Sequence, residues 1–264
     1  MPPLNRTRLF VLAVVAAAPV AGCRVKAFTP KDYTSHKELF AASKQRLDRR
    51  KWDDAIAGFE QLTIDLPARD TLLALAHYYL GLAHEKKGEH ILAAQSFTRL
   101  MESFPEDTLA DDALLAAGHA YRKLWRRSYL DAQYGEAALN TFSTLLALYP
   151  NSPLRPAAQH NVDQLTDQFA KKDYEAGLHY FRRKAYDSAI LYFKDVVRKF
   201  PQSDYARRSQ LRMVQSYDAI RYREDKEEIC ATLRERYPSD GEVRERCGIA
   251  PKPPPATPAA APTP

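Results

Sequence analysis

The sequence has little glycine and carries none of the short motifs that are typical of enzymes. Glycine accounts for 9 of the 264 residues, while alanine, leucine and long charged side chains are abundant, and this composition favours helices over sheets. A Gly-x-Ser-x-Gly motif, a phosphate-binding loop and a dinucleotide-binding fingerprint are all absent, although hydrolases and nucleotide-dependent enzymes commonly need them. We therefore predict an all-α protein that is not an enzyme.

The sequence also lacks clustered metal ligands and a strong excess of one charge. Its 7 histidines are scattered, without a His-Glu-x-x-His pair, so we predict no metal site and no cofactor. The net charge of +6 falls to about +4 if Arg6 and Arg8 belong to a segment that is removed. This charge is too small to predict nucleic acid as a partner.

A hydrophobic run long enough to span a membrane is missing too. The uncharged run from Leu9 to Ala21 follows Arg6 and Arg8 and is shorter than the roughly 20 residues that a spanning helix requires. A basic stretch before a short apolar run is typical of a secretory signal. We predict that residues 1–22 are a signal peptide.

The end of this run, Val20-Ala21-Gly22-Cys23, resembles the lipobox of bacterial lipoproteins. The resemblance implies that Cys23 carries a diacylglyceryl group and an N-acyl chain, and more than one chain makes such anchoring stable. Arg24 follows, where an acidic residue is typical of inner-membrane retention, so we expect the periplasmic face of the outer membrane. An ordinary secretory signal with an incidental cysteine is the alternative. Residues 23–33 would form a tether reaching roughly 35 Å at most.

A repeated pattern follows the tether. An alanine is followed after four residues by an aromatic residue, after three more by an aliphatic residue and after five more by a proline, as in Ala55, Phe59, Leu62 and Pro67. Preceding segments such as Leu80-Gly81-x-x-His84 supply a first helix for each pair. This is the tetratricopeptide pattern. We predict a superhelical solenoid over residues 34–248, with about five helix-turn-helix repeats that end near Pro67, Pro105, Pro150, Pro201 and Pro238.

The repeats are not uniform in length. We expect an insertion within Leu124 to Gly135 and one long helix from about Leu154 to Lys184, where the apolar spacing is helical. Gly241 to Cys247 would form a short capping turn or helix. The Pro- and Ala-rich tail, residues 249–264, cannot bury a core and is predicted to be disordered, with a spacer or wall-contacting segment as the alternative.

The first helices of the second and third repeats would line a groove for a peptide. An apolar floor with a basic rim suits an extended peptide that bears an aromatic side chain and a carboxylate. The alternative is that the leucines are core between repeats and the charges are a solvated surface. The candidate residues are Leu75, Tyr78, Leu82, Glu85 and Lys86 in the second repeat, and Asp112, Leu115, His119, Arg122 and Lys123 in the third.

Two further features leave alternatives open. Cys230 and Cys247 either form a disulfide in an oxidising periplasm, or Cys230 is buried in place of an aromatic residue and Cys247 is free. The basic clusters Arg49-Arg50-Lys51, Arg126-Arg127 and Arg182-Arg183-Lys184 either complement the C-terminal ends of helix dipoles or contact anionic lipid head groups.

A lipobox followed by five repeats, with an insertion and a long helix, resembles the BamD family. Its more specific matches are Lys51 to Ile56, Leu148 to Pro153 and Tyr186 to Ile190, with Asp131 and Gln133 in the insertion. The resemblance implies a scaffold of the β-barrel assembly machinery that binds proteins: the central barrel protein through the fourth and fifth repeats, other assembly lipoproteins, and unfolded outer-membrane precursors. The alternative is an adaptor of another envelope system, such as a pilotin for a secretin or pilus, or a cell-wall remodelling factor.

Overall fold

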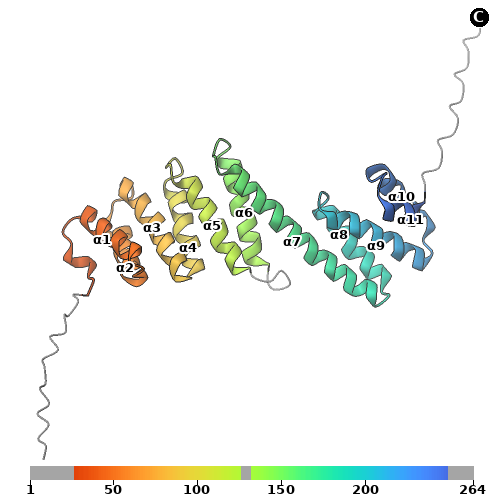
Figure 1. Ribbon diagram of the computed structural model, residues 1–264, viewed down its shortest axis with the longest axis horizontal. Coiled ribbons are helices and arrows are strands. Elements are labelled where there is room, and N and C mark those ends of the chain that lie inside the picture. Colours follow the sequence, from red (N-terminus) through yellow and green to blue (C-terminus); the bar gives the residue numbers. More distant parts are fainter. Residues whose placement is uncertain (1–26, 126–131, 249–264) are drawn as a thin grey trace, which may run out of the picture.

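The computed structural model describes residues 27–125 and 132–248, and these residues form helices only. In these two ranges, eleven α-helices and one 3₁₀ helix follow each other, and consecutive α-helices pack against one another in a single elongated row (Figure 1). The elements are η1 (Pro30–Asp32), α1 (His36–Asp48), α2 (Trp52–Asp65), α3 (Thr71–Lys87), α4 (His90–Ser103), α5 (Ala110–Leu124), α6 (Gln133–Leu148), α7 (Arg155–Arg182), α8 (Tyr186–Lys199), α9 (Asp204–Ile220), α10 (Arg223–Arg236) and α11 (Gly241–Cys247).

Prolines mark the end of each second helix. Helices α2, α4, α6, α8 and α10 all stop two residues before one of the prolines that define the repeat pattern, because proline removes a backbone donor and its ring disfavours helix in the residue before it. Acceptor side chains then start some of the following helices: Asp70 accepts from the backbone of Leu72, and Ser203 from that of Ala206. Each such cap contributes about 1 kcal/mol. The predicted solenoid of helix pairs is confirmed.

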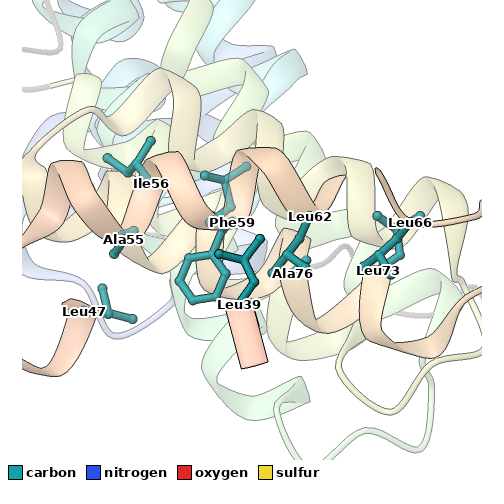
Figure 2. Close-up of a cluster of buried hydrophobic side chains, with 11 residues drawn as sticks. Leu39, Leu47, Ala55, Ile56, Phe59, Leu62, Leu66, Leu73 and Ala76 are labelled. Atoms are coloured by element: carbon teal, nitrogen blue, oxygen red, sulfur yellow. The ribbon is translucent and has the colours of Figure 1, made fainter. Parts of the chain in front are cut away.

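The core is divided among neighbouring pairs. The first cluster joins α1, α2 and α3 around the fully buried Phe59, and Leu39 and Leu62 belong to the same cluster (Figure 2). Phe97, Phe142 and Phe193 occupy the same place in later pairs and are also fully buried. Since burying a phenylalanine stabilises a fold by roughly 1.5–3 kcal/mol, the repeated aromatic position supplies much of each interface.

A small residue on the first helix makes room for each of these rings. A Cβ atom placed on Gly81 would lie 2.6 Å from Phe97, and one placed on Gly118 would lie 2.5 Å from Phe142. Such distances are well inside van der Waals contact, so the two helices approach as closely as they do only because glycine stands there. The glycine and aromatic positions of the sequence pattern are therefore one packing unit.

Of three irregular regions, one matches its sequence prediction, one settles an alternative that the sequence left open, and one differs. Helix α7 runs unbroken over 28 residues, as the apolar spacing predicted. Cys230 and Cys247 form a disulfide that joins α10 to the short terminal helix α11. The packed part of the chain, however, begins before residue 34, because Phe28 and Tyr33 pack against the first core cluster. Residues 28 and 33, which the sequence assigned to the tether, therefore belong to the packed part of the chain.

Candidate functional site

The candidate groove lies between α3 and α5, the first helices of two consecutive repeats. It is an open hollow of about 600 Å³. The helical spacing of its side chains explains their common direction, since residues three, four or seven apart share one face of a helix. Its lining residues are Tyr78 and Glu85 from α3 and Asp112, Leu115, Ala116, His119, Arg122 and Lys123 from α5.

The groove is electrically polarised along α5. Asp112 lies near the start of this helix, and Arg122 and Lys123 lie in its last turn. Ten helical residues separate Asp112 from Arg122, a distance of about 15 Å, which matches four or five residues of extended chain. Between the two ends, Leu115 and Ala116 supply apolar surface. An extended ligand with a carboxylate would therefore be held in one direction.

Arg122 is held in place by the long helix α7. Its guanidinium donates to the side-chain oxygen of Asn161 and, at 2.6 Å, to that of Gln164. Asn161 is buried, and its amide donates in turn to the carbonyl oxygen of Ala157. Both partners of Arg122 are neutral amides, so its positive charge is oriented without being neutralised. The sequence gives no sign of this support, because Asn161 and Gln164 lie about forty positions further along the chain.

Lys123 is held more loosely. Its ammonium group lies 2.6 Å from the carboxylate of Glu85 across the groove, but the Lys123 side chain remains 48% exposed. An ion pair with this exposure contributes little to stability, about 0–1 kcal/mol. A ligand carboxylate can therefore compete with Glu85 for Lys123 at small cost.

Burial shapes the other titratable groups. It lowers the pKa of His119, and the neighbouring Arg122 lowers it further, so His119 is neutral near pH 7. Its ring also makes an edge-on contact with Phe142 at 5.3 Å. Burial raises the pKa of Asp112, as does Asp111 beside it. The same desolvation raises the pKa of Tyr78, which remains a neutral hydrogen-bonding aromatic side chain.

Three predicted groove residues lie elsewhere. Leu75 lines a separate hollow at the N-terminal ends of α1 and α3, with Thr71 and Leu72. Leu82 packs between the first and second core clusters, which corresponds to the alternative of inter-repeat core. Lys86 is exposed and does not line the groove. Ala116, which does line it, was missed because a methyl side chain gives no chemical signal in the sequence.

Several other sequence features can now be placed. Cys23, Arg126-Arg127, Asp131 and the tail lie outside the described residues, while Gln133 begins α6. Within residues 27–125 and 132–248, no three His, Cys, Asp or Glu side chains are arranged to hold a metal ion. No helix in these ranges is both long and apolar enough to cross a membrane.

Paired helices stacked in a row, with an open groove on their first helices, define a tetratricopeptide-repeat solenoid. The sequence pattern of a family described as YfiO, outer membrane lipoprotein, matches residues 32–233. The chain belongs to this family.

Individual proteins are also similar to this chain. The chain is 25% identical to "Outer membrane protein assembly factor BamD" of Caulobacter vibrioides, over 89% of this chain and 78% of the relative. It is 24% identical to the protein of the same name from Xylella fastidiosa strain 9a5c, over 75% of this chain and 72% of that protein. Among solved structures, the tetratricopeptide-repeat domain of P58(IPK) aligns with a TM-score of 0.43 at 15% identity, covering 80% of this chain and 54% of that one.

Proposed function

We propose that this chain is a lipid-anchored scaffold of outer-membrane protein assembly that receives unfolded β-barrel precursors in the groove between α3 and α5. Support comes from the family match, from relatives named as outer membrane protein assembly factors, and from the lipobox that ends at Cys23. The observation that carries the proposal is the polarised groove. It combines an apolar middle, a neutral tyrosine and, at one end, the unneutralised Arg122 beside Lys123, which pairs with Glu85.

The ligand that best fits this groove is the end of an extended chain. A terminal carboxylate would meet Lys123 and the oriented guanidinium of Arg122, and an aromatic side chain would lie against Leu115 and Tyr78. Because the groove is open, it suits transient binding of many related sequences better than tight binding of one. A receiving site for precursors needs that property.

The fourth and fifth repeats would dock on the periplasmic domains of the central barrel protein. Helix α8 exposes Leu191, at 68%, and Tyr192, which stacks on Tyr180 at 5.0 Å. Tyr222, in the turn before α10, is 55% exposed and stacks on Tyr217. Exposed aromatic residues held rigid by stacking are typical anchors of protein interfaces.

The groove is tested with a labelled peptide that ends in an aromatic residue. We expect it to bind the purified chain, and both amidation of its terminal carboxylate and the Lys123→Glu substitution to weaken binding by about fivefold or more. Lys86→Glu is the matched control, since it makes the same charge change on a neighbouring exposed lysine outside the groove. Equal affinity of the acid and amide peptides would rule out the proposed recognition of the carboxylate.

The assembly role is tested by recovering partners from detergent-solubilised outer membranes with the chain tagged at its C-terminus. Recovery of a barrel protein with periplasmic repeat domains is the expected result. Recovery of a secretin, pilus or cell-wall protein in its place would assign the chain to another envelope system.

A further inference from the structure

One edge of the solenoid carries exposed cations that have no acidic partner among the described residues. The turns concerned are α1–α2, α3–α4 and α7–α8, each of which joins the first helix of a pair to the second. We call the unpaired cations of these three turns the basic edge: Arg49, Arg50 and Lys51 after α1, Lys86 at the end of α3, and Arg182 at the end of α7 with Arg183 and Lys184 after it. In Figure 1 the end of α7 and the connection from α3 to α4 lie on the lower side of the row, and the connections α4–α5 and α6–α7 lie on the upper side.

The acids near these turns do not cancel this charge. Lys87, which is not counted in the basic edge, already pairs with Asp53 at 2.8 Å and with Glu89 at 2.7 Å. Two acidic residues in these turns, Asp48 and Asp187, form no ion pair with any described residue. The cations therefore remain in clear excess, and their field extends into the solvent over about one Debye length, roughly 10 Å.

Turn geometry alone does not account for these cations. Arg50 and Lys184 have φ values of 58° and 61°, the left-handed conformation that Gly88 adopts at the same place between α3 and α4. Glycine would form this turn without the steric cost that a side chain brings. The C-terminal end of a helix carries only about half a negative charge. Three adjacent cations carry more positive charge than this can neutralise. The excess points to an external anionic partner.

The N-terminal end of the described chain lies beside the same edge. The Phe28 ring packs 5.0 Å below the guanidinium of Arg46, and the carbonyl of Arg46 accepts a hydrogen bond from the backbone of Lys51. The coloured ribbon accordingly begins on the lower side of the row (Figure 1). From Cys23 to Ala27 the chain spans four residues, which reach about 14 Å at most. A lipid on Cys23 would hold the first basic turn close to the membrane surface.

We infer that the basic edge binds the phosphate head groups of the membrane in which the chain is anchored, so that the solenoid lies along the bilayer. The inference rests on the lipid anchor of the proposed function. The first and the fourth repeat both carry these cations, so the solenoid would contact the membrane at two places far apart in the row. A single lipid anchor at one end cannot supply two such contacts. The opposite edge then faces away from the bilayer, and the groove between α3 and α5 keeps a constant orientation toward incoming chains.

The test measures the distance of each edge from the lipid head groups. The full lipidated chain is reconstituted into vesicles of phosphatidylcholine alone, or with roughly one third phosphatidylglycerol, and each contains a head-group quencher. A fluorophore is placed at Ala185→Cys on the basic edge or at Asn151→Cys on the opposite edge; both positions are exposed. We expect anionic vesicles to quench the first label and not the second. About 1 M NaCl, which shortens the Debye length to about 3 Å, should abolish the effect.

Paired charge reversals separate the basic edge from general charge. Arg182→Glu with Arg183→Glu should lower the edge-bound fraction at least about tenfold. Arg198→Glu with Lys199→Glu makes the same charge change at the other end of α8 and should leave it unchanged. Equal quenching of both labels, or equal effects of the two double substitutions, would overturn the inference. An acidic protein would then be the alternative partner of the basic edge.

Vesicle flotation reports on the anchor separately. If the chain floats with neutral vesicles but shows no edge-specific quenching, the lipid anchor is supported and the membrane contact of the basic edge is contradicted. If the chain floats only with anionic vesicles, and no longer floats after the Arg182 and Arg183 reversals, the basic edge binds lipid but the lipid anchor is contradicted.

Discussion

Val214 on α9 and Cys230 on α10 stand in the fifth repeat where Gly81 and Phe97 stand in the second. Both are buried in the last core cluster, with 2% and 1% of their surface exposed. In the fifth repeat the first helix carries valine in place of glycine, and the second helix carries cysteine in place of phenylalanine. The larger side chain on the first helix compensates for the smaller one on the second, and the pair still fills the space between the helices. The smaller residue is also a cysteine, so the sulfur that replaces the ring is free to bond to α11.

Adding one methyl group at Gly118 should destabilise the fold. The new Cβ atom of Gly118→Ala would lie 2.5 Å from the Phe142 ring, and such overpacking costs typically 1–3 kcal/mol. Denaturant unfolding measures the change. Gly241→Ala is the control, since nothing lies within 4 Å of its new Cβ atom. Equal stability of the two variants would contradict the close approach of α5 and α6.

Substitutions at two left-handed turn positions should differ in their effect on the free energy of unfolding. Gly88 has a φ of 89° and open space around it, so Gly88→Ala adds backbone strain alone and should cost about 1 kcal/mol. Arg221 has a φ of 64°, and Arg221→Gly should be neutral or stabilise the fold by up to about 1 kcal/mol. Thermal unfolding of both variants tests this. A stabilising Gly88→Ala would show that the turn adopts another conformation in solution.

Breaking the Cys230–Cys247 disulfide should loosen the C-terminal end of the solenoid. The bridge closes a loop with a sequence separation of 17, and a loop of this size is worth about 3 kcal/mol. We expect the Cys247→Ser variant to unfold more easily than the parent chain and hydrogen exchange to rise first in α11. Reductant should destabilise the parent and leave the variant unchanged. Two alkylated thiols in the untreated native chain, found by mass spectrometry, would show that the bridge does not form.

Acid should weaken the fold partly through His119. Burial and Arg122 lower its pKa in the folded chain below the usual 6.5, so the unfolded chain binds the proton more readily. Stability from the neutral imidazole is present above the unfolded pKa and is lost as the pH falls through the folded pKa. The free energy of unfolding should therefore fall less between pH 7 and pH 5 in His119→Gln than in the parent. Parallel pH profiles would show that His119 is solvated.

The sequence by itself determined the repeating architecture. Each pair depends on contacts between helices that are adjacent in the chain, so the spacing of Ala189, Phe193, Val196 and Pro201 carries the information for both the packing and the end of α8. The long helix α7 followed from the same helical periodicity, because no proline interrupts it after Pro156. Local patterns suffice where the interactions are local.

The tertiary structure alone decided which side chains support or line the groove and which belong to the core. Asn161 and Gln164 of α7 hold Arg122 of α5. Leu82 belongs to the core, whereas Leu115 lines the groove. These placements, and the packing of Phe28 against the first core cluster, depend on contacts between different helices or segments. Helical periodicity gives the direction of a side chain around its own axis but not the distance to a neighbouring helix. That distance depends on how closely the pairs stack, and it decides which side chains are buried between helices and which line a groove open to a ligand.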